Sequence, residues 1–297
     1  MKLGMILMFV AGLLAIPSLA QASPTDDYCY AEAYGGGSAN GNASWCSFTG
    51  TSPLVVKGPD WGSNVCAVTT FGGYFHNTSF DASHGDYVYV DRVADGSKSS
   101  GYAWEMVMHG SGDHIAGTMT CVPLSKFTFS TVTNVYHGGN YVSSGNTTPS
   151  LFASVNTQTN SFCFLNEWVG IQRNQYDYAD IYPNQSGPTG YYDLTITLGR
   201  SDDEIYTNFG CLSAGTSFVQ SSTYGINTYS QSQKLPDTSK AFCFFNELEG
   251  PWTDVESWVS IQNNPNGSRL LWTMAGTQSD GVTLNQTPGA AVTCAYY

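Results

Sequence analysis

The chain has 297 residues and a formal net charge of −13, and only 11% of its residues are charged. Nucleic-acid binding needs clustered Lys and Arg to neutralise phosphates, so 10 basic against 23 acidic residues argue against it. The same excess of negative charge disfavours binding to an anionic membrane surface.

The N-terminal 22 residues have the pattern of a secretory signal peptide. Lys2 supplies the positive end, residues 3–19 are apolar, and Ala20-Gln21-Ala22 fits a small-x-small cleavage site. We therefore expect cleavage near Ala22–Ser23 and a secreted, extracellular mature chain. A membrane anchor is the alternative for this stretch. No later segment is long and apolar enough to span a bilayer, so we expect no membrane insertion of the mature chain.

A block of sequence then occurs three times, and each copy is opened and closed by a cysteine. Self-similarity of this kind defines an architecture before any single residue does. We expect an N-terminal Gly/Asn-rich segment at 23–64, copies at 65–121, 162–211 and 242–297, and connectors at 122–161 and 212–241. A glycine follows each opening cysteine by seven residues; these glycines are Gly73, Gly170 and Gly250.

All eight cysteines follow the signal peptide, and the copies restrict their pairing. Equivalent copies should pair equivalently, and the two remaining cysteines then pair by elimination. One alternative is that Cys46 begins a degenerate copy. No C-x2-C spacing exists, which argues against a zinc site. The predicted disulfides are Cys29–Cys46, Cys66–Cys121, Cys163–Cys211 and Cys243–Cys294.

Within each copy the pattern is that of short strands with a period of two. We expect the opening strand, an aromatic strand, a third strand after a polar turn, and a fourth that runs into the closing cysteine. The aromatic strands begin at Tyr87, Tyr178 and Trp258. The third strands are expected at 102–108, 191–198 and 270–274, and the fourth at 117–121, 205–211 and 290–294. The connectors contain further strand-like pieces.

The predicted fold is therefore all-β, with about four antiparallel strands in each copy. In the favoured arrangement the copies share one core around a pseudo-threefold axis, in a prism-like or trefoil-like fold. A unit of about 50 residues buries too little apolar surface alone. The alternative is three small disulfide-stapled modules in a row.

The motif C-F-[LF]-x4-G followed by a closing cysteine resembles short modules of poorly characterised bacterial exported and surface proteins, some of them adhesin-like. It rests on Cys163-Phe164-Leu165 with Gly170 and on Cys243-Phe244-Phe245 with Gly250. The first copy departs from it with Ala67-Val68. The resemblance implies a binding or structural role and assigns no functional residue.

Signals for catalysis or metal binding are sparse, and we expect no cofactor and assign no catalytic residue. His109, Asp113 and His114 could bind a divalent metal, but Gly-Ser-Gly-Asp between them also describes a polar turn. Glu167 and Glu247 occupy equivalent positions in two copies, where a surface strand position explains them.

Aromatic residues are the best argument for binding, because flat rings stack on sugars. The alternative for each is a place in the core. The candidate ligand-binding residues are Trp104, Tyr191, Tyr192, Trp252 and Trp272.

Three functions follow from these features. The first is non-enzymatic recognition of glycans or of a cell surface, as a carbohydrate-binding or adhesin-like module or a subunit of an extracellular assembly. The second is a polysaccharide hydrolase that uses two carboxylates. The third is a coat or filament protein that self-assembles through strand edges.

Overall fold

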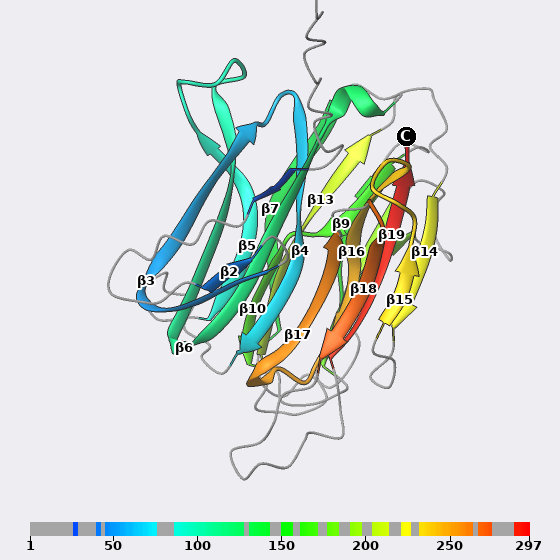
Figure 1. The fold of residues 1–297 in the computed structure, drawn as a ribbon. Helices are drawn as coiled ribbons and strands as arrows, with labels where there is room; N and C mark the ends of the chain where they lie inside the picture. Colours follow the sequence, from blue (N-terminus) through cyan, green and yellow to red (C-terminus); the bar gives the residue numbers. More distant parts are fainter. Residues whose placement is uncertain are drawn as a thin grey trace, which may run out of the picture.

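A computed structural model of the 297-residue chain gives the fold shown in Figure 1. The structure describes residues 26–28, 40–42, 45–75, 86–127, 131–142, 150–156, 161–171, 177–183, 191–197, 204–213, 221–226, 232–263, 267–274 and 288–297. The signal peptide prediction lies outside these residues. Within them no helix is long and apolar enough to cross a membrane.

The described chain consists almost entirely of antiparallel strands, as the period-two patterns predict. The first copy and the segment before it supply β1 (Asp26–Tyr28), β2 (Asn40–Asn42), β3 (Trp45–Asp60), β4 (Asn64–Tyr74), β5 (Tyr87–Ala94) and β6 (Tyr102–Pro123), followed by the short 3-10 helix η1 (Leu124–Lys126).

The second copy and its connector supply β7 (Thr131–Val142), β8 (Ser150–Asn156), β9 (Ser161–Leu165), β10 (Glu167–Ile171), β11 (Tyr178–Pro183), β12 (Tyr191–Thr197) and β13 (Glu204–Ser213). The third copy and its connector supply β14 (Ser221–Ile226), β15 (Ser232–Leu235), β16 (Ala241–Glu249), β17 (Thr253–Asn263), β18 (Arg269–Met274) and β19 (Gly289–Tyr296). The connectors therefore add strands.

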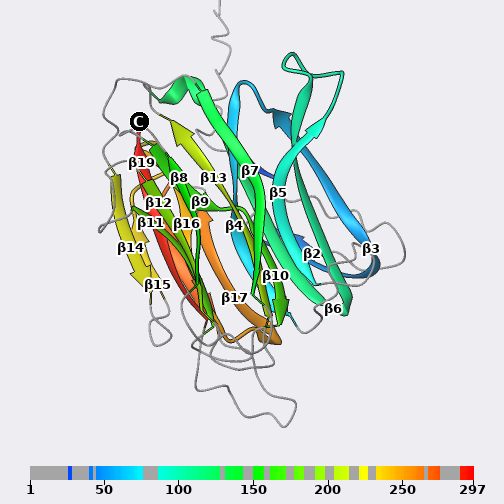
Figure 2. The same cartoon turned by 180° about the vertical axis from the view of Figure 1, so that it is seen from behind.

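The strands form a 13-stranded and a six-stranded sheet. The larger contains the path β15-β18-β17-β4-β6-β5-β10-β13-β7, and the smaller has the order β14-β19-β16-β11-β12-β8. Figures 1 and 2 show β3, β5 and β6 on one side of the molecule and β14, β15 and β19 on the other.

The long strand β6 bends, and the larger sheet folds with it. The first half of β6 pairs with β5 and the second half with β4, while β3 follows the opposite edge. A Cβ atom on Gly117 would lie 2.6 Å from the sulfur of Met108 and 2.9 Å from Val88. The two halves of β6 therefore pack against each other, and glycine permits this close approach. The expected third and fourth strands of the first copy are thus one bent strand.

Three disulfides join the opening and closing strands, as predicted. Each bridge connects residues that lie directly opposite each other in the ladder. The bridges are Cys66–Cys121, Cys163–Cys211 and Cys243–Cys294, with Cα–Cα distances of 4.1, 4.0 and 4.0 Å. The predicted Cys29–Cys46 pair lies outside the described side chains. Disulfides of this kind indicate an oxidising environment.

Each copy pairs its aromatic strand with the opening strand of another copy. Strand β5 pairs with β10, β11 with β16, and β17 returns to β4. The register is the same in all three ladders, where the fifth residue after the opening cysteine opposes the second residue of the aromatic strand. These pairs are Trp168–Val88, Leu248–Ala179 and Phe71–Val259. These three ladders connect the first copy to the second, the second to the third and the third back to the first. The pseudo-threefold axis between the copies stays a prediction.

One buried apolar cluster contains residues of all three copies. Ring centroids of Phe71 and Phe245 lie 5.6 Å apart, and those of Phe164 and Phe244 lie 5.0 Å apart. These contacts between copies, together with the shared ladders, contradict the alternative of three separate modules in a row.

The glycines seven residues after the opening cysteines have a backbone role in the first two copies. Gly73 and Gly170 have φ angles of 111° and 121°, a region that side-chain-bearing residues rarely adopt. The positive φ angle explains why a glycine stands seven residues after the opening cysteine in these two copies.

Candidate functional site

Two of the aromatic candidates belong to the core. Trp104 and Trp252 are fully buried. The indole Nε1 of Trp104 donates a hydrogen bond to the carbonyl of Asn64 at 2.9 Å. The ring of Trp252 packs edge-on against Phe75 at 5.8 Å. The prediction that these two rings face a ligand is therefore wrong, and the core alternative holds.

The side chains of the other three aromatic candidates fall outside the described part, although their strands are described. Tyr191 and Tyr192 belong to β12, between β8 and β11, and Trp272 lies in β18, opposite Ser232 and Ser260. Their role in ligand binding stays a prediction.

The histidine cluster lies within β6 and does not form a separate turn between two strands. His109 is buried, and its ring stacks on Tyr87 with centroids 5.3 Å apart. Asp113 and His114 follow in the same strand, and their side chains fall outside the described part. Among the side chains that the structure does describe, no group of three or more His, Cys, Asp or Glu residues could hold a metal ion.

A second cluster of apolar and aromatic residues lies apart from the main core, on the other face of the sheet formed by β6, β5, β10 and β13. Side chains alternate between faces along a strand, so Val88 and Val90 enter the main core while Tyr87 and Tyr89 do not. Tyr87 stacks on Tyr89, with centroids 5.7 Å apart and rings inclined by 26°. We call this side of the sheet the outer face; Tyr87, Val107 and Val169 are buried in it, and Tyr89 and Tyr206 are partly buried.

Carboxylates surround Tyr89 on the outer face. Glu167 lies directly opposite Tyr89 on β10, and Asp91 lies opposite Glu105 on β6. Burial raises the pKa of the half-buried Tyr89 hydroxyl, and Tyr87 and the three negative charges raise it further. Tyr89 therefore stays protonated and can donate a hydrogen bond.

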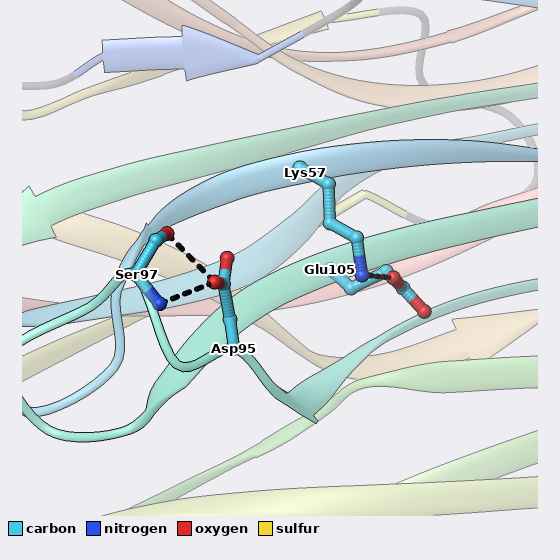
Figure 3. A network of polar contacts seen from close by, with 4 residues as sticks. All are labelled: Lys57, Asp95, Ser97 and Glu105. Carbon is cyan, nitrogen blue, oxygen red and sulfur yellow. Dashed lines mark hydrogen bonds and ion pairs between the residues drawn. The ribbon is translucent and has the colours of Figure 1, made fainter.

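Lys57 borders the acidic side chains of the outer face. Lys57 of β3 forms an ion pair with Glu105, next to the turn where Asp95 accepts hydrogen bonds from the backbone N–H and hydroxyl of Ser97 at 2.9 and 2.7 Å (Figure 3). These two bonds hold the pKa of Asp95 below its ordinary value. The ion pair and the two hydrogen bonds thus hold Glu105 and Asp95 in place beside the outer face.

The ladder between the second and third copies carries a related set of residues. The Tyr182 hydroxyl donates to Glu247 at 2.5 Å, and Glu249 lies two residues further along β16, opposite Tyr178. Burial and the neighbouring Glu247 raise the pKa of Glu249 to about 7. A carboxyl group with such a pKa can act as either an acid or a base near neutral pH.

The third ladder differs chemically at the equivalent positions. Thr70 and Ser260 replace the glutamate and the facing residue, and their hydroxyl oxygens lie 2.8 Å apart in a buried hydrogen bond. The ladders β5–β10 and β11–β16 therefore carry glutamate and tyrosine side chains at these positions, whereas the ladder β4–β17 carries a neutral, buried pair of hydroxyl groups.

No family model matches this chain, and none of the curated proteins matches it either. We therefore infer the function from the residues of this chain alone.

Proposed function

We propose that the protein is a secreted, non-enzymatic recognition protein that binds carbohydrate at the outer face. The observation that carries this proposal is Tyr89, a half-buried ring stacked on Tyr87 and surrounded by Asp91, Glu105 and Glu167. The C–H faces of a sugar stack on aromatic rings, and carboxylates accept hydrogen bonds from its hydroxyl groups. An aromatic ring and carboxylates therefore lie on the same face of one sheet.

The negative charge of the outer face limits the ligand class. Three carboxylates and one paired lysine would repel a uronic acid or a sulfated sugar but tolerate a neutral sugar and attract an amino sugar. The expected ligand is a neutral or amino-bearing oligosaccharide.

The test is a glycan array followed by titration calorimetry with the best ligand. The Tyr89→Ala variant should bind about tenfold more weakly or worse, because the stacking ring is removed. A matched control is Tyr224→Ala, since Tyr224 is a partly buried tyrosine of β14, at the far side of the molecule from β5 (Figures 1 and 2). Absence of glycan binding, or equal binding by Tyr89→Ala and the native protein, would refute the proposal.

Glu247 and Glu249 support a second candidate function, hydrolysis of polysaccharide with two carboxylates. The raised pKa of Glu249 fits a general acid, and hydrolysis needs one acid and one ionised carboxylate. The same purified protein is assayed for release of reducing sugar. Turnover that disappears in Glu249→Gln would favour the hydrolase over the recognition protein.

A further inference from the structure

An arginine near the end of β5 contacts two aromatic rings. The guanidinium carbon of Arg92 lies 5.2 Å from the ring centroid of Trp61, which follows β3, and 5.0 Å from that of Tyr102, which begins β6. The two rings meet edge to face, with centroids 6.4 Å apart and planes inclined by 68°. We call these three residues the arginine clamp.

The backbone and a carboxylate hold the clamp in place. The N–H of Trp61 donates to the carbonyl of Tyr102 at 3.1 Å. Asp60 accepts hydrogen bonds from the N–H of Gly62 at 2.7 Å, from the N–H of Ser100 at 3.2 Å and from the hydroxyl of Ser99. The two loops that carry the rings are therefore tied together without any contribution from Arg92.

The guanidinium of Arg92 remains available to a ligand. Its side chain is exposed, and no described carboxylate forms an ion pair with it. Asp91 accepts the backbone N–H of Arg92 at 2.6 Å and forms no described ion pair with its guanidinium. Asp60 binds the loop, Asp95 binds Ser97 and Glu105 binds Lys57. Stacking uses the faces of a guanidinium and leaves its N–H edge free for the paired oxygens of an oxyanion.

The site is distinct from the outer face. Tyr89 and Arg92 are three residues apart on β5, so their side chains leave opposite faces of the sheet. Tyr102 is 39% exposed and offers ring surface next to the guanidinium. Lys98, in the turn between β5 and β6, adds a second positive charge to this end of the molecule. Two negative charges, on Asp60 and Asp95, lie in the same loops and are held by hydrogen bonds, so the group is aromatic and of mixed charge. It differs in this from the outer face, where three carboxylates surround Tyr89.

We propose that the arginine clamp is a second binding site, which takes the carboxylate or sulfate group of an acidic saccharide. The oxyanion forms paired hydrogen bonds with the edge of Arg92, and the sugar ring packs against Tyr102. This site is independent of the carbohydrate site at the outer face.

The test is calorimetric titration of the full protein with tri-galacturonate, a sulfated disaccharide and neutral maltotriose. The native protein should bind one or both acidic probes and bind them more weakly as salt rises. Arg92→Gln should reduce this affinity about 10- to 100-fold, because a charge-assisted pair of hydrogen bonds is lost. Arg92→Lys, which keeps the charge and the aliphatic stem, should fall between the two.

The control is Tyr89→Ala, which should bind the acidic probes like the native protein. This separates the two proposals, since loss at the outer face leaves the clamp intact. The clamp proposal is overturned if neither acidic probe binds, if Arg92→Gln weakens binding of maltotriose as much as binding of the acidic probes, or if folded Arg92→Gln and Arg92→Lys proteins both bind the acidic probes as the native protein does. Preference for galacturonate or for the sulfated probe identifies the oxyanion.

Discussion

The residue three positions after each opening cysteine is polar and buried, and its environment differs between copies. The strand register skips at this residue in the first and third copies, which is a β-bulge. In the first copy the hydroxyls of Thr69 and Thr120 lie 2.7 Å apart. In the third copy Thr293 donates to the side-chain oxygen of Asn246 at 3.2 Å. Each bulge residue therefore bonds to the residue before the closing cysteine.

The second copy lacks this partner. Gly210 stands before its closing cysteine, and both amide atoms of the buried Asn166 lack a hydrogen-bond partner among the described residues. A buried amide without partners costs about 1–3 kcal/mol, so this position weakens the second copy relative to the other two. The bulge cannot be predicted from sequence, because a register skip depends on the facing strand.

Side chains alternate between the two faces of the sheet along β6, and this alternation predicts which of its residues are buried in the main core. Trp104 has the same parity as Met106 and Met108, and all three are buried in the main core. Glu105 and Val107 have the opposite parity and reach the outer face. The apolar neighbours of Trp104 therefore already indicated a core position. Nothing in the sequence indicated that Tyr89 would be joined by Glu167, because that contact depends on pairing between two copies.

Glu249 gives a pH-dependent stability that can be measured. Its pKa is raised from 4.5 to about 7 by burial and by Glu247, so the folded protein holds its proton more tightly than the unfolded chain does. This contribution to stability is fully present below about pH 4.5 and is lost as the pH rises through about 7. Since Glu249 is half-exposed, solvent screening limits the effect to about 1–2 kcal/mol.

The measurement compares urea unfolding of the native protein and of Glu249→Gln at about pH 5 and pH 8.5. The variant should be the more stable protein at the higher pH and should lose the difference at the lower pH. Parallel pH profiles of the two proteins would contradict the assignment of this titration to Glu249.

At the scale of elements, the strand ladders explain why the repeat pattern predicted so much of the fold. Aromatic and β-branched residues at period two located the strands, and equivalent cysteines located the opening and closing partners. The pattern could not reveal the bend of β6 or the pairing of β5 with β10, since alternation defines the faces of a strand and says nothing about its edges.

The three disulfides should contribute nearly equal chain entropy but unequal total stability. Their sequence separations of 55, 48 and 51 residues give about 4 kcal/mol each in the chain-entropy model, which depends only weakly on loop length. The third bridge has an additional contact, because the buried Arg269 donates from Nη1 to the sulfur of Cys243 at 3.1 Å and to the carbonyl of Ala241 at 2.9 Å.

Double Cys→Ala variants of each bridge test this expectation by urea unfolding. Loss of Cys243–Cys294 should lower the free energy of unfolding by about 1 kcal/mol more than loss of Cys66–Cys121, because Arg269 also loses its sulfur contact. Equal losses would show that this contact adds nothing to stability.

At the scale of the whole molecule, the ring of ladders couples the copies. The aromatic strand of each copy completes a sheet begun by another copy, and residues of all three enter one core. Unfolding one copy would expose strand edges and apolar surface of the other two. The copies cannot unfold independently at low cost, although each has its own disulfide.

We therefore expect one calorimetric unfolding transition rather than three. Val88→Ala, in the ladder between the first and second copies, and Val259→Ala, in the ladder between the third and first, both remove fully buried methyl groups. Each should destabilise the whole molecule by about 1–3 kcal/mol and shift the same transition, with calorimetric and van't Hoff enthalpies in agreement. Separate transitions, only one of which moves in each variant, would show that the copies fold as independent modules despite their shared strands.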